Sequence, residues 1–242
     1  RKIFSIMTKK YLLGLVLTII FIVSLSIPMV PFPQHWYEFP IIPGLEEKAR
    51  NIFFHVPMAW VSVIAFITSL VYAIQFLRKK NSLDDIKSAS AAEIGLVFCF
   101  LATVTGAIWA KFNWGMFWNW DPRQTSIFIL LLIYGAYFAL RSAIDIEEKR
   151  ATLSAVYAII AGLTVPFFIF VMPRITTGLH PGSGGDPNGN GPLFQSKGMA
   201  SNMRVLFYLS SIGFCLLYFW MWNLRVRIQK IALTQEEKSF HE

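Results

Sequence analysis

Three tryptophans lie close together in one short segment, Trp114-Gly115-Met116-Phe117-Trp118-Asn119-Trp120-Asp121. If this tryptophan segment (residues 114–121) were helical, Trp114, Trp118 and Asp121 would share one face, because residues three and four apart are neighbours on a helix. A face of indole rings that ends in a carboxylate suits a large planar apolar ligand such as a porphyrin. The alternative is an aromatic belt at a membrane interface, which does not account for such density in one segment.

Two of the four histidines stand where they could bind a metal. His55 lies at the start of a long apolar stretch, where we expect Pro57 to fall in a first helical turn, and His180 follows a later apolar stretch. Two imidazoles can ligate a haem iron from opposite faces. We therefore predict His55 and His180 as metal ligands. Each could instead be a polar residue at an interface, and His35, in a proline-rich segment, is a weaker candidate.

The end of the tryptophan segment has the pattern of a helix N-terminus. In Asp121-Pro122-Arg123-Gln124, Asp121 is a preferred N-cap and Pro122 suits the first helical position. We expect Arg123 to pair with Asp121 or with a ligand carboxylate, since haem propionates need cationic or N–H partners. Other basic residues expected on the same side are Arg50, Arg174 and Lys197.

These residues are separated by long apolar stretches. The chain is 55% hydrophobic and 15% charged, whereas a soluble domain is roughly 25% charged. A membrane-spanning helix needs about 20 apolar residues. We predict an all-α integral membrane bundle of six transmembrane helices that forms a single domain over residues 1–242, with outer loops at about 31–51, 111–123 and 173–202. The predicted spans are approximately 11–30, 52–77, 91–110, 124–140, 151–172 and 203–223.

Basic residues indicate the orientation of the bundle. Lys and Arg cluster near the N-terminus and within 78–87, 141–150 and 225–238, and such clusters favour the cytoplasmic side. We therefore predict that both termini are cytoplasmic and that the tryptophan segment lies outside. The net charge of +8 is thus a topology signal, and binding to nucleic acid is not expected. Ser90-Ala91-Ala92-Glu93 has the form of a capping box that would open the third helix.

The sequence from Trp114 to Ser126 is similar to the W-G-x-x-W-x-W-D signature of haem-handling membrane proteins. His55-Val56-Pro57 precedes it and Leu179-His180 follows it. On these motifs the chain resembles the haem exporter protein C family, also called cytochrome c maturation protein C. The resemblance implies that haem b is bound reversibly, as cargo, and that His55 and His180 are its axial ligands. It assigns haem contacts to Trp114, Trp118, Trp120 and Asp121.

The resemblance also implies partners and a location. Family members present haem on the periplasmic face of the bacterial inner membrane and pass it to a membrane-anchored haem chaperone for c-type cytochrome biogenesis. They work beside ABC-type ATPase and permease subunits and a small single-span subunit. The chain departs from the family pattern at Pro122 and in the glycine-rich loop 182–199. No step of haem transfer needs a catalytic residue here, so we do not expect an enzyme.

Other functions fit the residues less well. A b-type haem protein that exchanges electrons with quinone would hold its haem between histidines inside the bundle, and the predicted span interiors contain none. A permease subunit of an ABC-type transporter would carry charged residues along the spans, and these are nearly absent. A larger synthase relative would have a further outer domain. Cys99 and Cys215 lie in apolar spans and form no haem-attachment motif.

Overall fold

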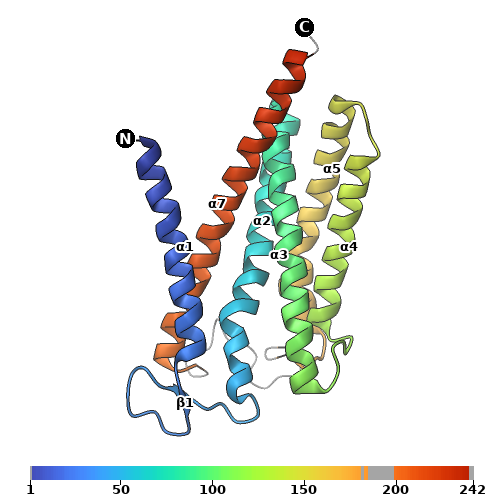
Figure 1. The fold of residues 1–242 in the computed structure, drawn as a ribbon. Helices are drawn as coiled ribbons and strands as arrows, with labels where there is room; N and C mark the ends of the chain where they lie inside the picture. The colour runs from blue at the N-terminus through green and yellow to red at the C-terminus, as the bar shows by residue number, and fades with distance from the viewer. Residues whose placement is uncertain (1, 181–182, 185–198, 240–242) are drawn as a thin grey trace.

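The computed structural model describes residues 2–180, 183–184 and 199–239 of this chain, and side chains between residues 12 and 235 within those ranges. The described part is almost entirely helical (Figure 1). Its elements are α1 (Lys2–Ser26), β1 (Met29–Val30), β2 (Phe39–Pro40), the 3-10 helix η1 (Glu46–Asn51), α2 (Ile52–Lys79), α3 (Ser82–Trp114), α4 (Pro122–Ser142), α5 (Glu147–Pro166), the π-helix η2 (Phe167–Val171), α6 (Met172–Ile175) and α7 (Ser201–Ser239).

The predicted all-α membrane bundle is confirmed. Five helical segments are long and apolar enough to cross a bilayer, with η1 continuing into α2, and α5 into η2 and α6. The remaining predicted span corresponds to α1, whose described apolar part, Leu12–Ser26, is shorter. The protein is therefore a multi-pass membrane protein. The five segments are Glu46–Lys79, Ser82–Trp114, Pro122–Ser142, Glu147–Ile175 and Ser201–Gln235.

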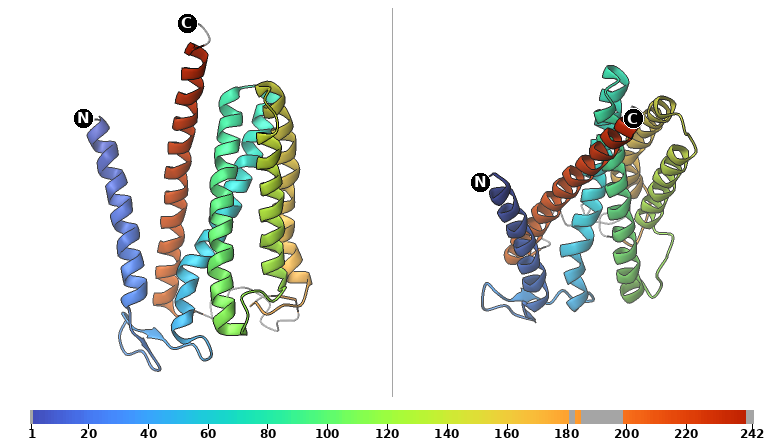
Figure 2. Two further views of the ribbon diagram at one scale, coloured as in Figure 1. Left: turned by 45° about the vertical axis from the view of Figure 1, so that its right-hand side comes forward. Right: turned by 45° about the horizontal axis from the view of Figure 1, so that its top comes forward.

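Helix α2 is the centre of the bundle, since it packs against α3, α5 and α7 (Figures 1 and 2). Helix α1 lies at one side and packs against α7. Helix α1 begins, and α7 ends, at the same end of the bundle, while the α3–α4 connection that contains the tryptophan segment lies at the opposite end. That arrangement suits the predicted topology. Which end faces the cytoplasm stays a prediction.

Aromatic stacking joins α2 to α4 in the middle of the bundle. The rings of Phe66 and Tyr134 stack with their centroids 3.6 Å apart, and both residues are completely buried. Helix α3 approaches the same place through Gly95, where a Cβ atom would lie 2.8 Å from the Phe66 ring. A glycine at this position therefore sets how closely α3 and α2 can pack.

Pro57 lies inside a continuous helix, so the prediction that it falls in a first turn is wrong. Helix η1 adds residues before Ile52, and the helical run therefore begins at Glu46. A proline has no N–H group, which leaves the carbonyl four residues earlier, that of Phe53, without its helical donor. The hydroxyl of Ser210 on α7 donates to the Phe53 carbonyl instead. This bond satisfies the helix at its proline and joins α2 to α7.

The predicted capping box at Ser90 is also wrong. Helix α3 begins at Ser82, with Asn81 as its N-cap, because the Asn81 side chain accepts the Leu83 N–H at 3.0 Å. Ser90 is buried inside α3 and donates to Gln229 of α7, and Glu93 forms an ion pair with Arg225 of α7 at 2.7 Å. The polar residues that resembled a cap therefore connect α3 to α7.

A further ion pair joins α3 to α4 near the same end of the bundle. Both guanidinium nitrogens of Arg141 donate to the carboxylate of Asp85, at 2.7 and 2.8 Å. Both side chains are largely buried. The planar, two-bond geometry fixes the relative orientation of the two helices at this point.

The first outer loop, predicted at 31–51, is more ordered than a loop. Strands β1 and β2 pair in parallel, with Met29 opposite Phe39, and η1 follows them. From η1, Arg50 donates to the carbonyls of Ser24 and Ile27 at 2.8 and 2.7 Å, which satisfies the C-terminal end of α1. Arg50 is therefore already engaged in holding α1 against the start of α2.

Candidate functional site

The tryptophan segment is not helical, so the predicted single face of indoles is wrong. Helix α3 ends at Trp114 because Gly115 adopts a left-handed conformation with φ of 84°. The N–H of Gly115 donates to the Lys111 carbonyl at 3.1 Å. Residues 115–121 then form a bent connection that leads to α4.

The predicted N-cap at Asp121 is confirmed. Its carboxylate accepts the Arg123 N–H at 2.9 Å, and Pro122 occupies the first turn of α4. Gln124 then fixes the segment from the other side, since its amide accepts the Asn119 N–H at 2.9 Å and donates to the Phe117 carbonyl at 3.2 Å. The short connection is therefore held rigidly against α4.

Asp121 also holds His180, which comes from the far end of α5–α6. The Asp121 side chain is completely buried, and its Oδ1 lies 2.6 Å from His180 Nδ1. Its Oδ2 accepts the Leu179 N–H at 2.6 Å and the His180 N–H at 3.3 Å. Burial raises the pKa of the Asp121 carboxyl, but the hydrogen bond and charge of His180, with the Arg123 and Leu179 N–H groups, outweigh it and lower the pKa to about 2. The carboxylate is therefore ionised.

Gly178 permits this approach of the His180 loop to α4. A Cβ atom on Gly178 would lie 2.8 Å from Asp121 Oδ2 and 2.8 Å from Pro122 Cδ. The Gly184 N–H donates to the Thr176 carbonyl at 2.8 Å. His180 is held against Asp121 through both its main-chain N–H and its ring.

Two indoles surround the His180 ring. Trp114 meets it edge to face, with centroids 4.7 Å apart, and Trp109 lies nearly parallel to it at 6.4 Å. Trp109 also donates through Nε1 to the Lys48 carbonyl at 3.2 Å, which links α3 to η1. Sequence reasoning did not single out Trp109, because it falls in a predicted apolar span. The available signal was a further tryptophan only five positions before Trp114.

His55 points towards α3. Its Nδ1 lies 3.2 Å from Thr105 Oγ1, and its ring lies over Gly106, where a Cβ atom would be 2.7 Å from His55 Cε1. His55 is partly buried, and its contacts on α3, Thr105 and Gly106, lie about one helical turn from Trp109, which is beside His180. Both predicted ligands therefore lie at the same end of the bundle, on separate elements.

Trp118 and Trp120 form a separate pair. Their rings meet edge to face at 5.9 Å, and Trp118 also meets Phe128 of α4 at 5.7 Å. Trp120 is 72% exposed and has a φ of 55°, a conformation that is costly for a residue with a large side chain. The predicted tryptophans are thus divided into Trp114, beside His180, and the pair Trp118 and Trp120.

Among the predicted cationic residues, Arg123 is the one best placed for an anionic ligand. Its Nε is buried and has no hydrogen-bond partner within the described residues, and it lies in the first turn of α4, directly after Asp121 and Pro122. Arg50 is occupied by α1 carbonyls, as described above, and the exposed Arg174 donates to the Phe170 carbonyl at 2.7 Å. Lys197 and most of the glycine-rich loop 182–199 lie outside the described residues.

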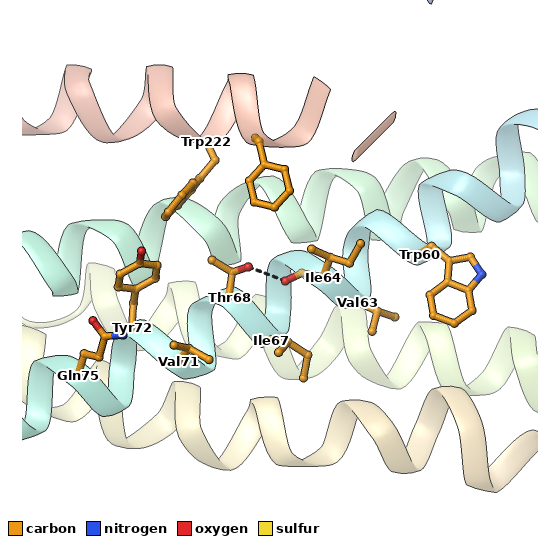
Figure 3. Close-up of a pocket in the computed structure, with 10 residues that line it drawn as sticks. Trp60, Val63, Ile64, Ile67, Thr68, Val71, Tyr72, Gln75 and Trp222 are labelled. Atoms are coloured by element: carbon orange, nitrogen blue, oxygen red, sulfur yellow. Dashed lines mark hydrogen bonds between the residues drawn. The ribbon is translucent and has the colours of Figure 1, made fainter. Parts of the chain in front are cut away.

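A cavity of about 440 Å³ lies elsewhere, along α2 where it faces α7 (Figure 3). Its lining is mainly apolar and includes none of the predicted site residues; Trp60 is at one end, and Tyr72 and Trp222 are at the other. We therefore place the candidate site at the histidine pair. Among the described residues, no group of three or more His, Cys, Asp or Glu side chains is arranged to hold a bare metal ion.

Comparison with known proteins identifies the family. A family model described as Heme exporter protein C matches residues 10–241. The Heme exporter protein C of Paracoccus denitrificans is 30% identical over 180 residues, which are 74% of this chain and 72% of that protein. Its namesake from Bradyrhizobium diazoefficiens is 34% identical over 61% of this chain and 57% of its own length. A "cytochrome c biosynthesis ccmC-like mitochondrial protein" of Marchantia polymorpha is 36% identical over 51% and 52%. This chain therefore belongs to the heme exporter protein C family.

Proposed function

We propose that this protein binds haem b reversibly between His55 and His180 and hands it to a haem chaperone during c-type cytochrome biogenesis. The hydrogen bond between His180 Nδ1 and the buried Asp121 carboxylate is the observation that carries the proposal. Histidines that ligate metals usually donate their second ring N–H to a carboxylate or similar acceptor, which fixes the tautomer and leaves the other nitrogen for the metal. The names of the relatives support a role in haem export and cytochrome c biogenesis.

The hydrogen bonds favour the same tautomer for both histidines. The ionised Asp121 can only accept, so His180 carries its proton on Nδ1. The Thr105 hydroxyl donates to the Leu101 carbonyl at 2.8 Å, so it accepts from His55 Nδ1. In the neutral form of each ring, Nε2 then keeps its lone pair. This is the protonation state that iron ligation requires.

The surrounding residues supply the remaining contacts for a haem. We assign Arg123, whose Nε is otherwise unpaired within the described part of the chain, to a propionate. Trp114, Trp118 and Trp120 offer indole faces to the macrocycle, and the exposed Trp120 ring is accessible to it from outside the bundle. Asp121 contributes through His180. The chain needs no catalytic group, because haem transfer exchanges ligands and breaks no bond within the haem.

The proposal includes the setting of the protein. The haem site lies on the periplasmic side of the bacterial inner membrane, with both termini in the cytoplasm. The partners are a membrane-anchored haem chaperone, ABC-type ATPase and permease subunits, and a small single-span subunit. Haem is cargo in this scheme, so an open site at the end of the bundle is an advantage over one enclosed in its centre.

A spectroscopic experiment tests the proposal. The protein is purified in detergent after expression with haem available, and the Soret absorbance per protein is compared with that of the double variant His55→Ala/His180→Ala. We expect a low-spin bis-histidine spectrum from the unaltered protein and loss of most haem from the double variant. Equal Soret absorbance in both proteins at equal yield would reject the site.

The role of Arg123 has its own test. We expect Arg123→Met to weaken the binding of haem about tenfold, because a charge-assisted hydrogen bond contributes about 1.5 kcal/mol. Haem dimethyl ester, which lacks both carboxylates, should bind the two proteins equally. The measurement is a haem titration followed at the Soret band. If Arg123→Met weakens the binding of haem and of haem dimethyl ester to the same extent, Arg123 supports the fold and does not meet a propionate.

A further inference from the structure

The two histidines have partners of unequal strength. His180 Nδ1 is 2.6 Å from the buried Asp121 carboxylate, whereas His55 Nδ1 is 3.2 Å from the hydroxyl of Thr105. Hydrogen bonds to ionised acceptors are roughly twice as strong as those between neutral groups. A carboxylate partner also makes the opposite ring nitrogen a more basic ligand. His180 is therefore the stronger donor to iron.

The main chain adds to this inequality. Asp121 accepts the N–H groups of both Leu179 and His180, so the same carboxylate holds the ring and the backbone that carries it. His55 has no comparable ionic anchor. Its ring is positioned by the Thr105 hydroxyl, by a hydrogen bond to the Ala102 backbone, and by the absence of a side chain at Gly106, where a Cβ atom would lie 2.7 Å from the ring.

We propose that His180 is the retained iron ligand and His55, positioned by Thr105 and Gly106, the exchangeable one, so that haem release begins at the bond between iron and His55. In that step the iron–Nε2 bond to His55 breaks and a bond forms from iron to a neutral nitrogen donor of the imidazole class. One neutral two-electron donor replaces another, and neither a proton nor an electron is transferred. This inference rests on the proposed haem binding and adds the order in which the ligands leave.

Single histidine variants separate the two ligands. We expect His55→Ala to keep most of its haem, with a change from low-spin to high-spin absorbance and electron paramagnetic resonance signals. Added imidazole should restore the low-spin spectrum. We expect the haem content of His180→Ala to be lower by a factor of about ten or more, in line with the effect of removing a strong ligand and its supporting contacts. The reverse pattern, or equal loss of haem from both variants, would overturn the inference.

The positioning residues are tested by spin state at constant haem content. Gly106→Ala should displace the His55 ring and give the high-spin spectrum of His55→Ala, and alanine in place of a helical glycine favours folding. Gly135→Ala is its control, because nothing lies within 4 Å of a Cβ atom there. Thr105→Val should weaken the iron–His55 bond, which is measured as a lower imidazole concentration for half-exchange.

Thr103→Val is the control for Thr105→Val, since Thr103 makes the same type of bond within α3, donating to the Cys99 carbonyl at 2.8 Å. We expect both control variants to keep the low-spin spectrum and the imidazole response of the unaltered protein. A low-spin spectrum in Gly106→Ala at full haem content would contradict the assigned role of Gly106. Failure of the unaltered protein to bind haem would instead reject the proposed function, and this inference with it.

Discussion

Asp121 has two structural functions that a single carboxylate seldom combines. It caps α4 through the Arg123 N–H and fixes His180 through a buried hydrogen bond. The cap requires only an oxygen acceptor, and asparagine is as good as aspartate in that position. The effect of Asp121 on the His180 ring depends on negative charge, because an ionised acceptor increases the basicity of the imidazole. A change from carboxylate to amide therefore separates the two functions.

We predict that Asp121→Asn keeps the fold and raises the haem reduction potential by about 60 mV, which corresponds to about 1.4 kcal/mol for one electron. Loss of the negative charge destabilises ferric iron relative to ferrous iron. A potentiometric titration of the purified protein measures the change. Asp84→Asn, at the opposite end of α3 from the site, is the control and should leave the potential unchanged. An unaltered potential in Asp121→Asn would mean that His180 does not ligate the iron.

Single residues of the site were predictable where local chemistry determines them. The Asp-Pro pair indicated the cap at Asp121, and the structure confirms it. Trp109, Thr105 and Gly106 were not predictable, because their roles depend on how α3 packs against α2 and against the His180 loop. Glycine and threonine in an apolar helix are otherwise unremarkable, and only a neighbouring helix gives them a function.

At the scale of elements, the proline of α2 explains a contact between two helices. Pro57 leaves the Phe53 carbonyl without a donor from its own helix, and Ser210 of α7 supplies one. Phe53 and Ser210 are both completely buried, so water cannot replace that donor. The pairing of α2 with α7 is therefore determined by hydrogen bonding in addition to side-chain packing.

We predict that Ser210→Ala lowers the stability of the protein in detergent by about 1 kcal/mol, the usual scale for a hydrogen bond between membrane helices. The neighbouring Ser211 donates to the Phe207 carbonyl within α7 itself, so Ser211→Ala should have little effect. Thermal unfolding followed by size-exclusion chromatography compares the two variants. Equal melting temperatures would show that the Phe53 carbonyl finds another donor.

The helices themselves were predictable from apolar length, and their ends were not. Every predicted span lies in or overlaps a helix of the structure, although α3 begins at Ser82, well before the apolar residues. Asp84 and Asp85 continue the helix as a polar first turn, and Asp85 is stabilised there by Arg141 of α4. An apolar window cannot detect such a turn, because the stabilising residue is distant in sequence.

At the scale of the whole molecule, the alternating helices separate the chain into two ends. The α3–α4 connection, whose Asp121 holds His180, and the beginning of α2, which carries His55, lie at one end, and the start of α1 and the end of α7 lie at the other. The basic clusters predict that the second end is cytoplasmic. The orientation of the whole protein thus decides on which side of the membrane the histidine pair lies.

Thiol accessibility in intact cells tests the predicted orientation. In a background of Cys99→Ala and Cys215→Ala, Trp36→Cys in the first outer loop should react with a membrane-impermeant maleimide. Ile146→Cys, between α4 and α5, should react only after permeabilisation. Both side chains are well exposed, at 81% and 68%, so access to the protein surface is not limiting. Labelling of Ile146→Cys alone in intact cells would invert the topology.

The backbone at Trp120 carries a consequence for the evolution of this protein. Its left-handed conformation suits glycine far better than tryptophan, and its indole is mostly exposed, so this side chain adds little to folding. Selection for thermostability alone would not retain it. Its presence is best explained by a functional role that a measurement of folding stability does not detect. Laboratory evolution towards heat resistance, without selection for cytochrome assembly, should therefore lose this residue early.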